Sequence, residues 1–224
     1  MTSATTARRA IGAAFRAVIL GAPASGKGTV SSRIVKSFNV THVSSGDILR
    51  RHIMQKTELG LEVSKYLSKG DLVPDETMIV LIGKEVESLD KKNWLLDGFP
   101  RTVAQAERLQ QLYPVNIVIN LVVPHDVILK RVEGRWVHLP SGRVYNIGFN
   151  EPKVSGKDDV TGEPLVQRPD DKREVVERRL NDYAKNTEPV IEYYRKTGIL
   201  SDFHGSTTDE MWPSIKDYVA KFTS

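Results

Sequence analysis

The sequence predicts an α/β fold built on a parallel, doubly wound sheet of five strands. The first observation is a regular alternation of short apolar runs with longer segments of helical pattern, which is typical of βαβ units. The second is that an apolar run such as residues 117–123 is continuous, as expected of a strand buried on both faces. The third is a glycine-rich turn at residues 21–29, between the first apolar run and the first helical segment.

The predicted elements follow one another in a simple order. The expected strands span residues 17–20, 40–43, 94–97, 117–123 and 199–203. The expected helices span residues 30–38, 74–89, 103–113, 124–134, 172–196 and 209–222. A further helix begins near Asp47, and Gly60 and Gly70 are expected to divide the remainder of that segment into two short helical pieces.

Residues at two of the expected helix starts suit those positions. Pro74 and Pro124 stand where a helix opens, a place where the missing N–H of proline costs nothing. Asp75 and Glu76 lie in the first turn after Pro74, where the helix dipole favours negative charge. These residues support the helices at 74–89 and 124–134.

Residues 135–171 break the alternation. They are rich in glycine, proline and aspartate and carry short β-like pieces such as residues 143–145. About three dozen residues without a helix exceed an ordinary connection, so we expect a small inserted lid. Because the chain has no cysteine, polar contacts are expected to hold this lid together.

Composition narrows the class of protein. A chain of 224 residues with 40% hydrophobic and 27% charged residues suits one α/β domain with insertions. Its lack of cysteine excludes disulfides and thiolate metal sites, and no apolar stretch is long enough to span a bilayer. The net charge of +4 fits nucleic acid or small phosphorylated ligands. No RNA-binding signature accompanies it, so we expect small ligands, with neither nucleic acid nor membrane as a partner.

Residues 1–15 contain serine, threonine, alanine and arginine but no acidic residue. Acid-poor leaders with arginine resemble mitochondrial targeting segments, and Ile11 and Phe15 are spaced to share one helical face. We therefore expect delivery to the mitochondrial matrix. The alternative is a cytoplasmic protein with a basic tail.

The glycine-rich turn at residues 21–29 favours phosphate binding. A turn of this kind presents backbone N–H groups at a helix N-terminus, where the peptide dipoles favour negative charge. Lys27 adds a positive charge that can reach terminal phosphates, and Thr29 adds a hydroxyl group. Gly28 stands where serine or threonine follows the lysine in the general P-loop pattern, so the alternative is a turn without a ligand.

Charged residues at the ends of the predicted elements favour phosphoryl transfer. One guanidinium group can bind two phosphate oxygens at once. Each arginine taken alone is also explained as a solvated surface residue. The candidates are Arg50, Arg101, Arg131, Arg135, Arg168 and Arg179. Asp97 ends a buried strand and is the first candidate for organising Mg²⁺, with Asp47 the second. The sequence shows no Ser/His/Asp or Cys/His constellation and no metal-ligand spacing of histidines.

Three motifs together resemble the adenylate kinase family: GAPASGKGT at residues 21–29, SSGDILR at 44–50 and DGFPRT at 97–102. Gly28 is that family's own version of the loop. Further matches at residues 134–138, 141–146 and 158–165 extend the resemblance over nearly everything from Ala17 onward, and the pattern is most similar to the mitochondrial GTP:AMP phosphotransferase branch.

The resemblance implies a P-loop NTPase-like core of residues 16–43, 74–133 and 172–224. It also implies a helical NMP-binding domain at residues 44–73 and a small β-rich lid at residues 134–171. The protein would be a monomer that uses Mg²⁺ and closes both domains around its nucleotides.

The same resemblance implies which residues bind each nucleotide. The triphosphate would contact Ala24, Ser25, Gly26, Lys27, Gly28, Thr29, Arg135, Tyr145, Asn146 and, near its base, Thr208. AMP would contact Ser45, Arg50, Asp71, Leu72, Val73, Gly98, Phe99, Pro100, Arg101, Gln105, Arg168 and Arg179. Catalytic roles would fall to Lys27, Arg101, Arg131, Arg135, Arg168 and Arg179.

Many lids in this family hold zinc with cysteines, but here the corresponding residues are His138, Ser141, Asp158 and Thr161. They resemble the hydrogen-bonded version of the lid, so no zinc is expected. Ala24 departs from the family by replacing a glycine, and it would be strained if that position needs φ > 0.

The expected activity is transfer of the γ-phosphoryl group of GTP to AMP, giving GDP and ADP. An ATP-using adenylate kinase is the alternative within the class, and a UMP/CMP kinase lies further away. From a different class, the chain could be a P-loop nucleotide-binding regulator without catalysis, although such a protein has no need of Ser45, Arg50, Arg101 and Gln105 together.

Overall fold

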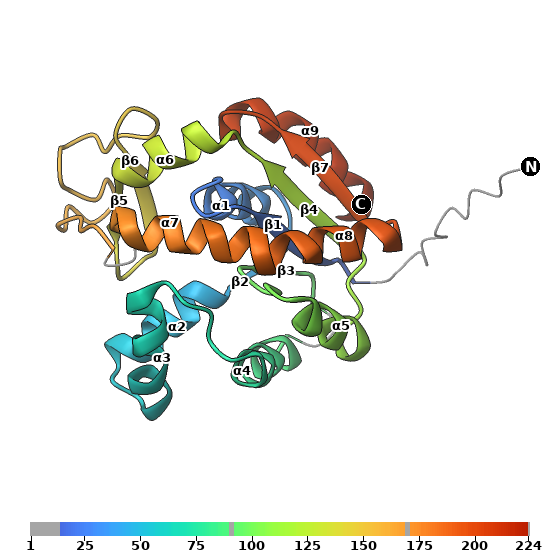
Figure 1. Ribbon diagram of the computed structural model, residues 1–224. Helices are drawn as coiled ribbons and strands as arrows, with labels where there is room; N and C mark the ends of the chain where they lie inside the picture. The colour runs from blue at the N-terminus through green and yellow to red at the C-terminus, as the bar shows by residue number, and fades with distance from the viewer. Residues whose placement is uncertain (1–13, 90–91, 169–170, 224) are drawn as a thin grey trace, which may run out of the picture.

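The computed structural model describes residues 14–89, 92–168 and 171–223, so nearly all of the expected leader at residues 1–15 lies outside the described residues. Its central sheet has five parallel strands in the order β2-β3-β1-β4-β7 (Figure 1). The strands are β1 (Arg16–Gly21), β2 (Thr41–Ser44), β3 (Trp94–Asp97), β4 (Ile117–Val122) and β7 (Leu200–His204). The predicted five-stranded parallel sheet is confirmed.

Helices cover both faces of this sheet, as a doubly wound fold requires. They are α1 (Lys27–Ser37), α2 (Ser45–Met54), α3 (Glu58–Lys69), α4 (Asp75–Glu87), α5 (Val103–Leu112), α6 (His125–Glu133), α7 (Arg173–Asp182), α8 (Glu188–Thr197) and α9 (Thr208–Thr223). Along β1, Ile19 packs into a buried cluster with α1 and α9, whereas Val18 packs into a second cluster with α4, α5 and α8. Successive strand residues point to opposite faces, so the continuous apolar runs fill two cores.

Two of the expected helix boundaries are wrong, and both lie at glycines. The first helix begins at Lys27 instead of residue 30, because Gly26 (φ 96) already serves as its N-cap. Gly60 does not separate two helical pieces but lies in the first turn of α3. A Cβ atom at Gly60 would lie 2.1 Å from the carbonyl oxygen of His52, so the glycine allows α3 to pack directly against the end of α2.

The long helix expected at residues 172–196 is formed by α7 and α8, joined by a π-helical turn at Tyr183–Thr187. In that turn the Glu188 N–H donates to the carbonyl oxygen of Tyr183, five residues earlier. Figure 1 shows the two helices as one continuous rod that runs from the small second sheet across the molecule.

That second sheet has two antiparallel strands, β5 (Arg135–His138) and β6 (Arg143–Asn146). Isolated bridges, such as the one between Val137 and Val166, attach the loops that follow. On the other side of the core, α2 and α3 form a compact pair below α7 (Figure 1). Within the described part of the chain, no helix is long and apolar enough to cross a membrane.

The parallel arrangement brings several turns to one edge of the sheet. The glycine-rich turn follows β1, the start of α2 follows β2, residues 98–102 follow β3 and residues 205–207 follow β7. The carboxyl ends of parallel strands are where open α/β sheets bind their ligands. Every motif that the sequence singled out in the core therefore lies along this edge.

Candidate active site

The glycine-rich turn joins β1 to α1 and places Lys27 at the helix start. The Lys27 ammonium group donates hydrogen bonds to the carbonyl oxygens of Gly21 and Ala22, each at 2.8 Å. Among the described residues, none caps α1 with a side chain and no acid lies in its first turn. The positive end of this helix dipole is therefore available to an anion, as phosphate binding requires.

A second set of contacts fixes the middle of the same turn. Ala24 has φ 62, in the left-handed region that favours glycine, so the alanine is strained there as the sequence predicted for a position with φ > 0. Arg131 donates hydrogen bonds to the carbonyl oxygens of Ala24, at 3.3 Å, and Ser206, at 2.7 Å. The hydroxyl of Thr208 lies over Gly26, where a Cβ atom would approach it to 2.9 Å. The turn after β7 thus packs on the glycine-rich turn.

Charged groups converge on Lys27. Burial lowers the pKa of its ammonium group from 10.5 to about 8, against the opposing effect of the Asp97 carboxylate. The positive charges of Arg101, Arg179 and Arg135 lower that pKa further. Three of the arginines expected to act in catalysis therefore lie within electrostatic reach of the predicted phosphate-binding lysine.

Two of these arginines contact a carboxylate of the chain itself. Arg135 donates from Nε to Asp171 at 2.8 Å, and its Nη2 forms a second contact with the same carboxylate. The Arg179 guanidinium lies 3.9 Å from that carboxylate. Arg101 differs, because its Nε donates to the carbonyl oxygen of Gly98 at 2.8 Å.

The two candidate magnesium-site aspartates have different surroundings. Asp97 ends β3 beside the glycine-rich turn, and its carboxylate lies 3.6 Å from the His42 ring nitrogen. Asp47 instead pairs with Arg50 at 2.5 Å, and its backbone N–H donates to the Ser44 hydroxyl. Burial tends to raise the pKa of the Asp47 carboxyl, but the charge of Arg50 prevails and lowers it. The carboxylate of Asp47 is therefore already neutralised by a protein cation.

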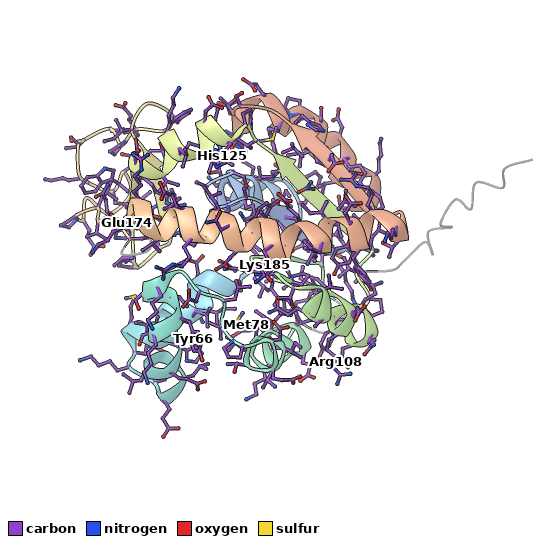
Figure 2. All side chains as sticks on the ribbon, in the orientation of Figure 1. Tyr66, Met78, Arg108, His125, Glu174 and Lys185 are labelled. Carbon is purple, nitrogen blue, oxygen red and sulfur yellow. The ribbon has the colours of Figure 1, made fainter. Side chains whose placement is uncertain are left out.

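A pocket lies between α2, α3 and the turn after β3. It is lined by Ser45, Gly46, Leu49, Arg50, Leu67, Gly70, Asp71, Leu72, Val73, Met78, Gly98, Arg101, Gln105 and Arg179. Figure 2 shows Met78 of α4 and Tyr66 of α3 on the two sides of this region. Ser45 is 1% exposed, and the described residues give its hydroxyl oxygen no hydrogen-bond partner. A buried hydroxyl of this kind is suited to a polar ligand.

Gln105 lies at the base of this pocket and is 2% exposed. Its amide oxygen accepts from the Arg101 N–H at 2.7 Å, and its amide nitrogen donates to Asp75 at 2.7 Å. Asp75 also accepts from the Thr102 hydroxyl at 2.9 Å. These bonds fix the orientation of the amide group and of the turn that carries Arg101.

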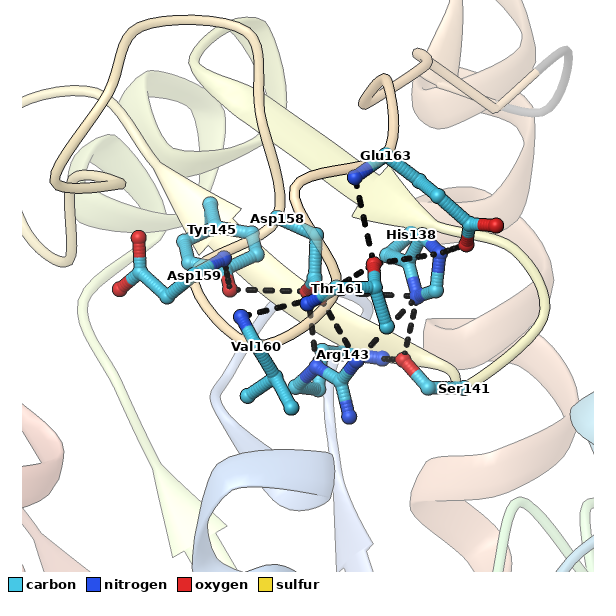
Figure 3. Close-up of polar contacts among 9 residues, drawn as sticks. All are labelled: His138, Ser141, Arg143, Tyr145, Asp158, Asp159, Val160, Thr161 and Glu163. Atoms are coloured by element: carbon cyan, nitrogen blue, oxygen red, sulfur yellow. Dashed lines mark hydrogen bonds and ion pairs between the residues drawn. The ribbon is translucent and has the colours of Figure 1, made fainter.

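The segment around β5 and β6 is held by a polar network centred on Asp158 (Figure 3). The Asp158 carboxylate accepts two hydrogen bonds from Arg143, both at 2.7 Å, one from Tyr145 at 2.9 Å and one from Thr161 at 2.9 Å. The Arg143 bonds lower the pKa of the Asp158 carboxyl far below its ordinary value, against the effect of burial. The predicted polar staple is therefore present.

His138 joins this network from β5. Its Nδ1 lies 2.7 Å from the Ser141 hydroxyl and its Nε2 lies 2.5 Å from the Glu163 carboxylate (Figure 3). Across the described residues, no three His, Asp or Glu side chains gather in a way that could hold a metal ion. Arg143 and Glu163 were not among the predicted members, since a motif match does not show which neighbours a side chain contacts.

Some predicted binding residues occupy other places. The Tyr145 hydroxyl is engaged with Asp158 and accepts from the Asp159 N–H, so its side chain belongs to the interior of the lid segment. Asn146 donates to the carbonyl oxygen of Arg131 at 2.6 Å and ties β6 to α6. Of the described residues predicted to contact AMP, three do not line the pocket: Phe99, Pro100 and Arg168.

Several residues of the pocket were missed from sequence. Gly46 and Leu49 share a face of α2 with Ser45 and Arg50, and this helical spacing was the available signal. Leu67 and Met78 gave no signal, because apolar residues on helices are expected in a core.

The fold and this site define a class: a P-loop nucleotide-binding protein with a second ligand pocket beside the phosphate loop. The sequence model of the family described as adenylate kinase matches residues 19–199. A mitochondrial GTP:AMP phosphotransferase of Drosophila melanogaster is 51% identical over 202 residues, covering 90% of this chain and 94% of the relative. One of the same name from Saccharomyces cerevisiae is 45% identical over 215 residues, covering 92% of both chains.

A protein named adenylate kinase from Vanderwaltozyma polyspora is 44% identical over 215 residues, covering 92% of this chain and 96% of the relative. The chain therefore belongs to the adenylate kinase family. It is a phosphotransferase of the nucleoside monophosphate kinase class.

Proposed function

We propose that this kinase transfers the γ-phosphoryl group of GTP to AMP, giving GDP and ADP. The observation that carries the proposal is the pocket beside the phosphate loop, which gathers Ser45, Arg50, Arg101 and Gln105 as an AMP site would. GTP as donor is supported by the names of the relatives from Drosophila melanogaster and Saccharomyces cerevisiae.

On this proposal the triphosphate lies along residues 24–29 and at the N-terminus of α1. Lys27 releases the carbonyl oxygens of Gly21 and Ala22, which it now binds at 2.8 Å, and donates to phosphate oxygens instead. Arg131 donates to the carbonyl oxygens of Ala24 and Ser206. Its role is therefore to fix the position of the phosphate loop relative to the turn after β7, which lies near the base of the triphosphate.

The acceptor phosphate of AMP faces the same charges from the other side. Arg101 and Arg179 line the pocket and also act on the charge of Lys27, so they stand between the two nucleotides. Phosphoryl transfer needs positioning and charge neutralisation more than a covalent nucleophile, and guanidinium groups supply both. Arg135 reaches the same centre from β5 when it leaves Asp171.

The site also fits Mg²⁺. Asp97 offers a carboxylate at the end of β3 that acts on the charge of Lys27, and carboxylate with phosphate oxygens is the donor set that Mg²⁺ prefers. When bound, the ion neutralises charge on the β- and γ-phosphates. Asp47 is the weaker candidate, because it pairs with Arg50.

We further propose that residues 44–73 act as the NMP-binding domain and residues 134–171 as the lid, both closing on the core of residues 16–43, 74–133 and 172–224. The two segments face each other in the structure: a Cβ atom at Gly142 would lie 3.7 Å from the Asp47 carboxylate, and the charge of Arg168 acts on the same group. Closure of both segments would exclude water from the transferring phosphoryl group.

A coupled assay tests the reaction. Production of ADP is followed with AMP and each of GTP, ATP and ITP, with Mg²⁺ and with EDTA in its place. The proposal expects the highest kcat/KM with GTP and loss of activity in EDTA. A preference for ATP would instead establish the alternative donor, and GTP binding without any AMP phosphorylation would favour a non-catalytic nucleotide-binding protein.

Location and assembly complete the proposal: a monomer in the mitochondrial matrix. Two relatives are named mitochondrial, which supports the organelle. Fractionation of cells that express the full chain, with protease protection inside isolated mitochondria, tests the compartment. Light scattering at micromolar concentration tests the monomer, and a mass of two chains would contradict it.

A further inference from the structure

The start of α7 packs closely on the end of α3. In Figure 2, Glu174 at the start of α7 lies above Tyr66 of α3. Helix α3 ends at Lys69 and is capped by Gly70, whose backbone is left-handed (φ 79, ψ 9). A Cβ atom at Gly70 would lie 2.9 Å from the Cγ1 atom of Val175 and 3.1 Å from the Cγ atom of Arg179. A larger residue at this point would force Val175 or Arg179 to move and would strain the left-handed backbone.

Arg178 adds polar contacts at the same junction. Its Nη1 donates to the carbonyl oxygen of Lys69 at 2.8 Å, at the end of α3. The same guanidinium nitrogen lies 3.8 Å from the Asp71 carboxylate. An arginine at a helix C-terminus satisfies a carbonyl that the helix leaves unpaired and complements the negative end of the dipole.

The segment held in this way forms one wall of the pocket. Residues 70–73 line the pocket, as does Leu67 near the end of α3. Arg179, the next residue of α7, lines the pocket as well, whereas Arg178 faces the end of α3. Arg179 therefore contacts the pocket directly, while its neighbour Arg178 contacts the end of α3 that forms the wall of that pocket.

We propose that Arg178 is a positioning residue for the acceptor nucleotide. It holds the end of α3 and residues 70–73 against α7, so that this wall of the pocket is in place before AMP binds. The inference rests on the proposed function, because it concerns the pocket assigned there to AMP. It assigns Arg178 no contact with either nucleotide.

The two contacts of Arg178 differ in expected strength. The ion pair with Asp71 is long, and its side chains are 52% and 43% exposed, so solvent screens it. The hydrogen bond to Lys69 is short and charge-assisted, and it carries most of the effect. Its loss is expected to raise KM for AMP about fivefold and to change kcat less than twofold, since Arg178 does not touch the reacting groups.

Steady-state kinetics of the full chain test this inference. KM for AMP is measured at saturating GTP, and KM for GTP at saturating AMP, for the wild type, Arg178→Ala and Arg178→Lys. Arg173→Ala is the matched control, because Arg173 is also on α7, its ion pair among the described residues is with Glu177 of its own helix, and its side chain is 72% exposed. Equilibrium binding of AMP and the midpoint of thermal unfolding are measured on the same four proteins.

The expected result is a rise in KM and Kd for AMP in Arg178→Ala alone, with KM for GTP unchanged and a partial recovery in Arg178→Lys. The inference is overturned if KM for AMP does not change, or if KM for both nucleotides and the unfolding midpoint shift together. If Arg178→Ala does not fold, the shift in Arg178→Lys against Arg173→Ala decides. Failure of the proposed function is seen separately, as a wild type that does not phosphorylate AMP.

Discussion

The donor and acceptor sides of the site differ in what their polar groups bind before any nucleotide arrives. On the donor side, Lys27 binds the carbonyl oxygens of its own turn and Arg135 binds Asp171. On the acceptor side, Gln105 and Arg101 are also bound, but to residues that shape the pocket itself, and among the described residues Ser45 has a buried hydroxyl without a partner, as Ser25 has in the donor turn.

This difference separates two ways of preparing a site. Donor binding replaces hydrogen bonds within the protein with hydrogen bonds to phosphate. The binding free energy from these groups is therefore the difference between the bonds formed and the bonds broken. Acceptor binding enters a pocket in which Gln105 and residues 70–73 are already held by contacts within the protein, before the segments close. We therefore expect changes of charge, pH and lid structure to affect the donor first.

The largest effect is expected from Lys27→Met. This change removes the positive charge on which Asp97 and three arginines act, so kcat should fall on the order of a hundredfold or more. Lys36→Met is the control, because Lys36 is exposed on the same helix. Near-normal turnover in a folded Lys27→Met variant would remove the lysine from the mechanism.

A smaller effect is expected from Asp158→Asn in the lid segment. The change weakens four hydrogen bonds from Arg143, Tyr145 and Thr161, and the loosened lid should raise KM for GTP roughly tenfold with little change for AMP. Asp159→Asn alters the adjacent, exposed carboxylate but keeps an oxygen that can accept from the Lys153 N–H, so it should change neither value. Equal losses for both nucleotides would show that the comparison between the two sides is wrong.

The pH dependence of donor binding should follow Lys27. Its pKa of about 8 in the free protein rises when phosphate binds, so binding takes up a proton above that pH. Affinity for a non-hydrolysable GTP analogue should therefore be steady below pH 7, fall about twofold between pH 7 and 8 and fall about fivefold between pH 8 and 9. Titration calorimetry measures it, and AMP affinity should stay flatter across the same range.

The control for that titration is Lys27→Arg, since a guanidinium group stays charged throughout. Its affinity is expected to be independent of pH over this range. The same shift affects folding: between pH 8 and 10.5 the unfolded chain binds more protons at Lys27 than the folded one, so this lysine makes stability rise with pH there.

The smallest effect is expected from Ala24→Gly. The left-handed backbone destabilises a folded protein with alanine at this position by about 1–2 kcal/mol. Glycine removes that strain but gives the unfolded chain more freedom, which lowers the free energy of unfolding by about 0.4–1 kcal/mol. The net gain is about 0.5–1 kcal/mol, and the unfolding midpoint should rise by about 1–4 °C. Lys56→Gly, at the other described non-glycine with positive φ, should give a similar gain without altering KM for GTP. A lower midpoint for Ala24→Gly would mean that the alanine is not strained.

Much of the fold could be predicted because it depends on short sequence signals. The central strands β1, β3 and β4 carry continuous apolar runs, and the ends of β3 at Trp94 and Asp97 were predicted to the residue. The boundaries at Gly26 and Gly60 were not, because they depend on an N-cap conformation and on the carbonyl of His52 across the helix pair. Such packing has no local signature.

The site could be predicted where family motifs name the residues, as at Ser45, Arg101 and Gln105, which the structure brings to one pocket. Contacts between segments could not be predicted. The pairing of Arg178 with the end of α3, and of His138 with Glu163, joins residues whose types are ordinary on a surface. Only the folded arrangement shows which of many charged side chains meet.

The π-helical turn between α7 and α8 has a consequence for insertions and deletions. The turn contains one residue more than an α-helical turn needs, and its wider hydrogen-bonded ring absorbs that residue. Removing one residue from 183–187 would therefore restore α-helix without rotating α8 relative to α7. Val190, Ile191 and Tyr194 would stay in the core and Arg179 at the pocket, whereas a deletion between Glu188 and Val190 would rotate the rest of α8 by about 100°. The π-helical turn is thus the one described place in this helix pair where the chain can lose a residue and keep both contacts.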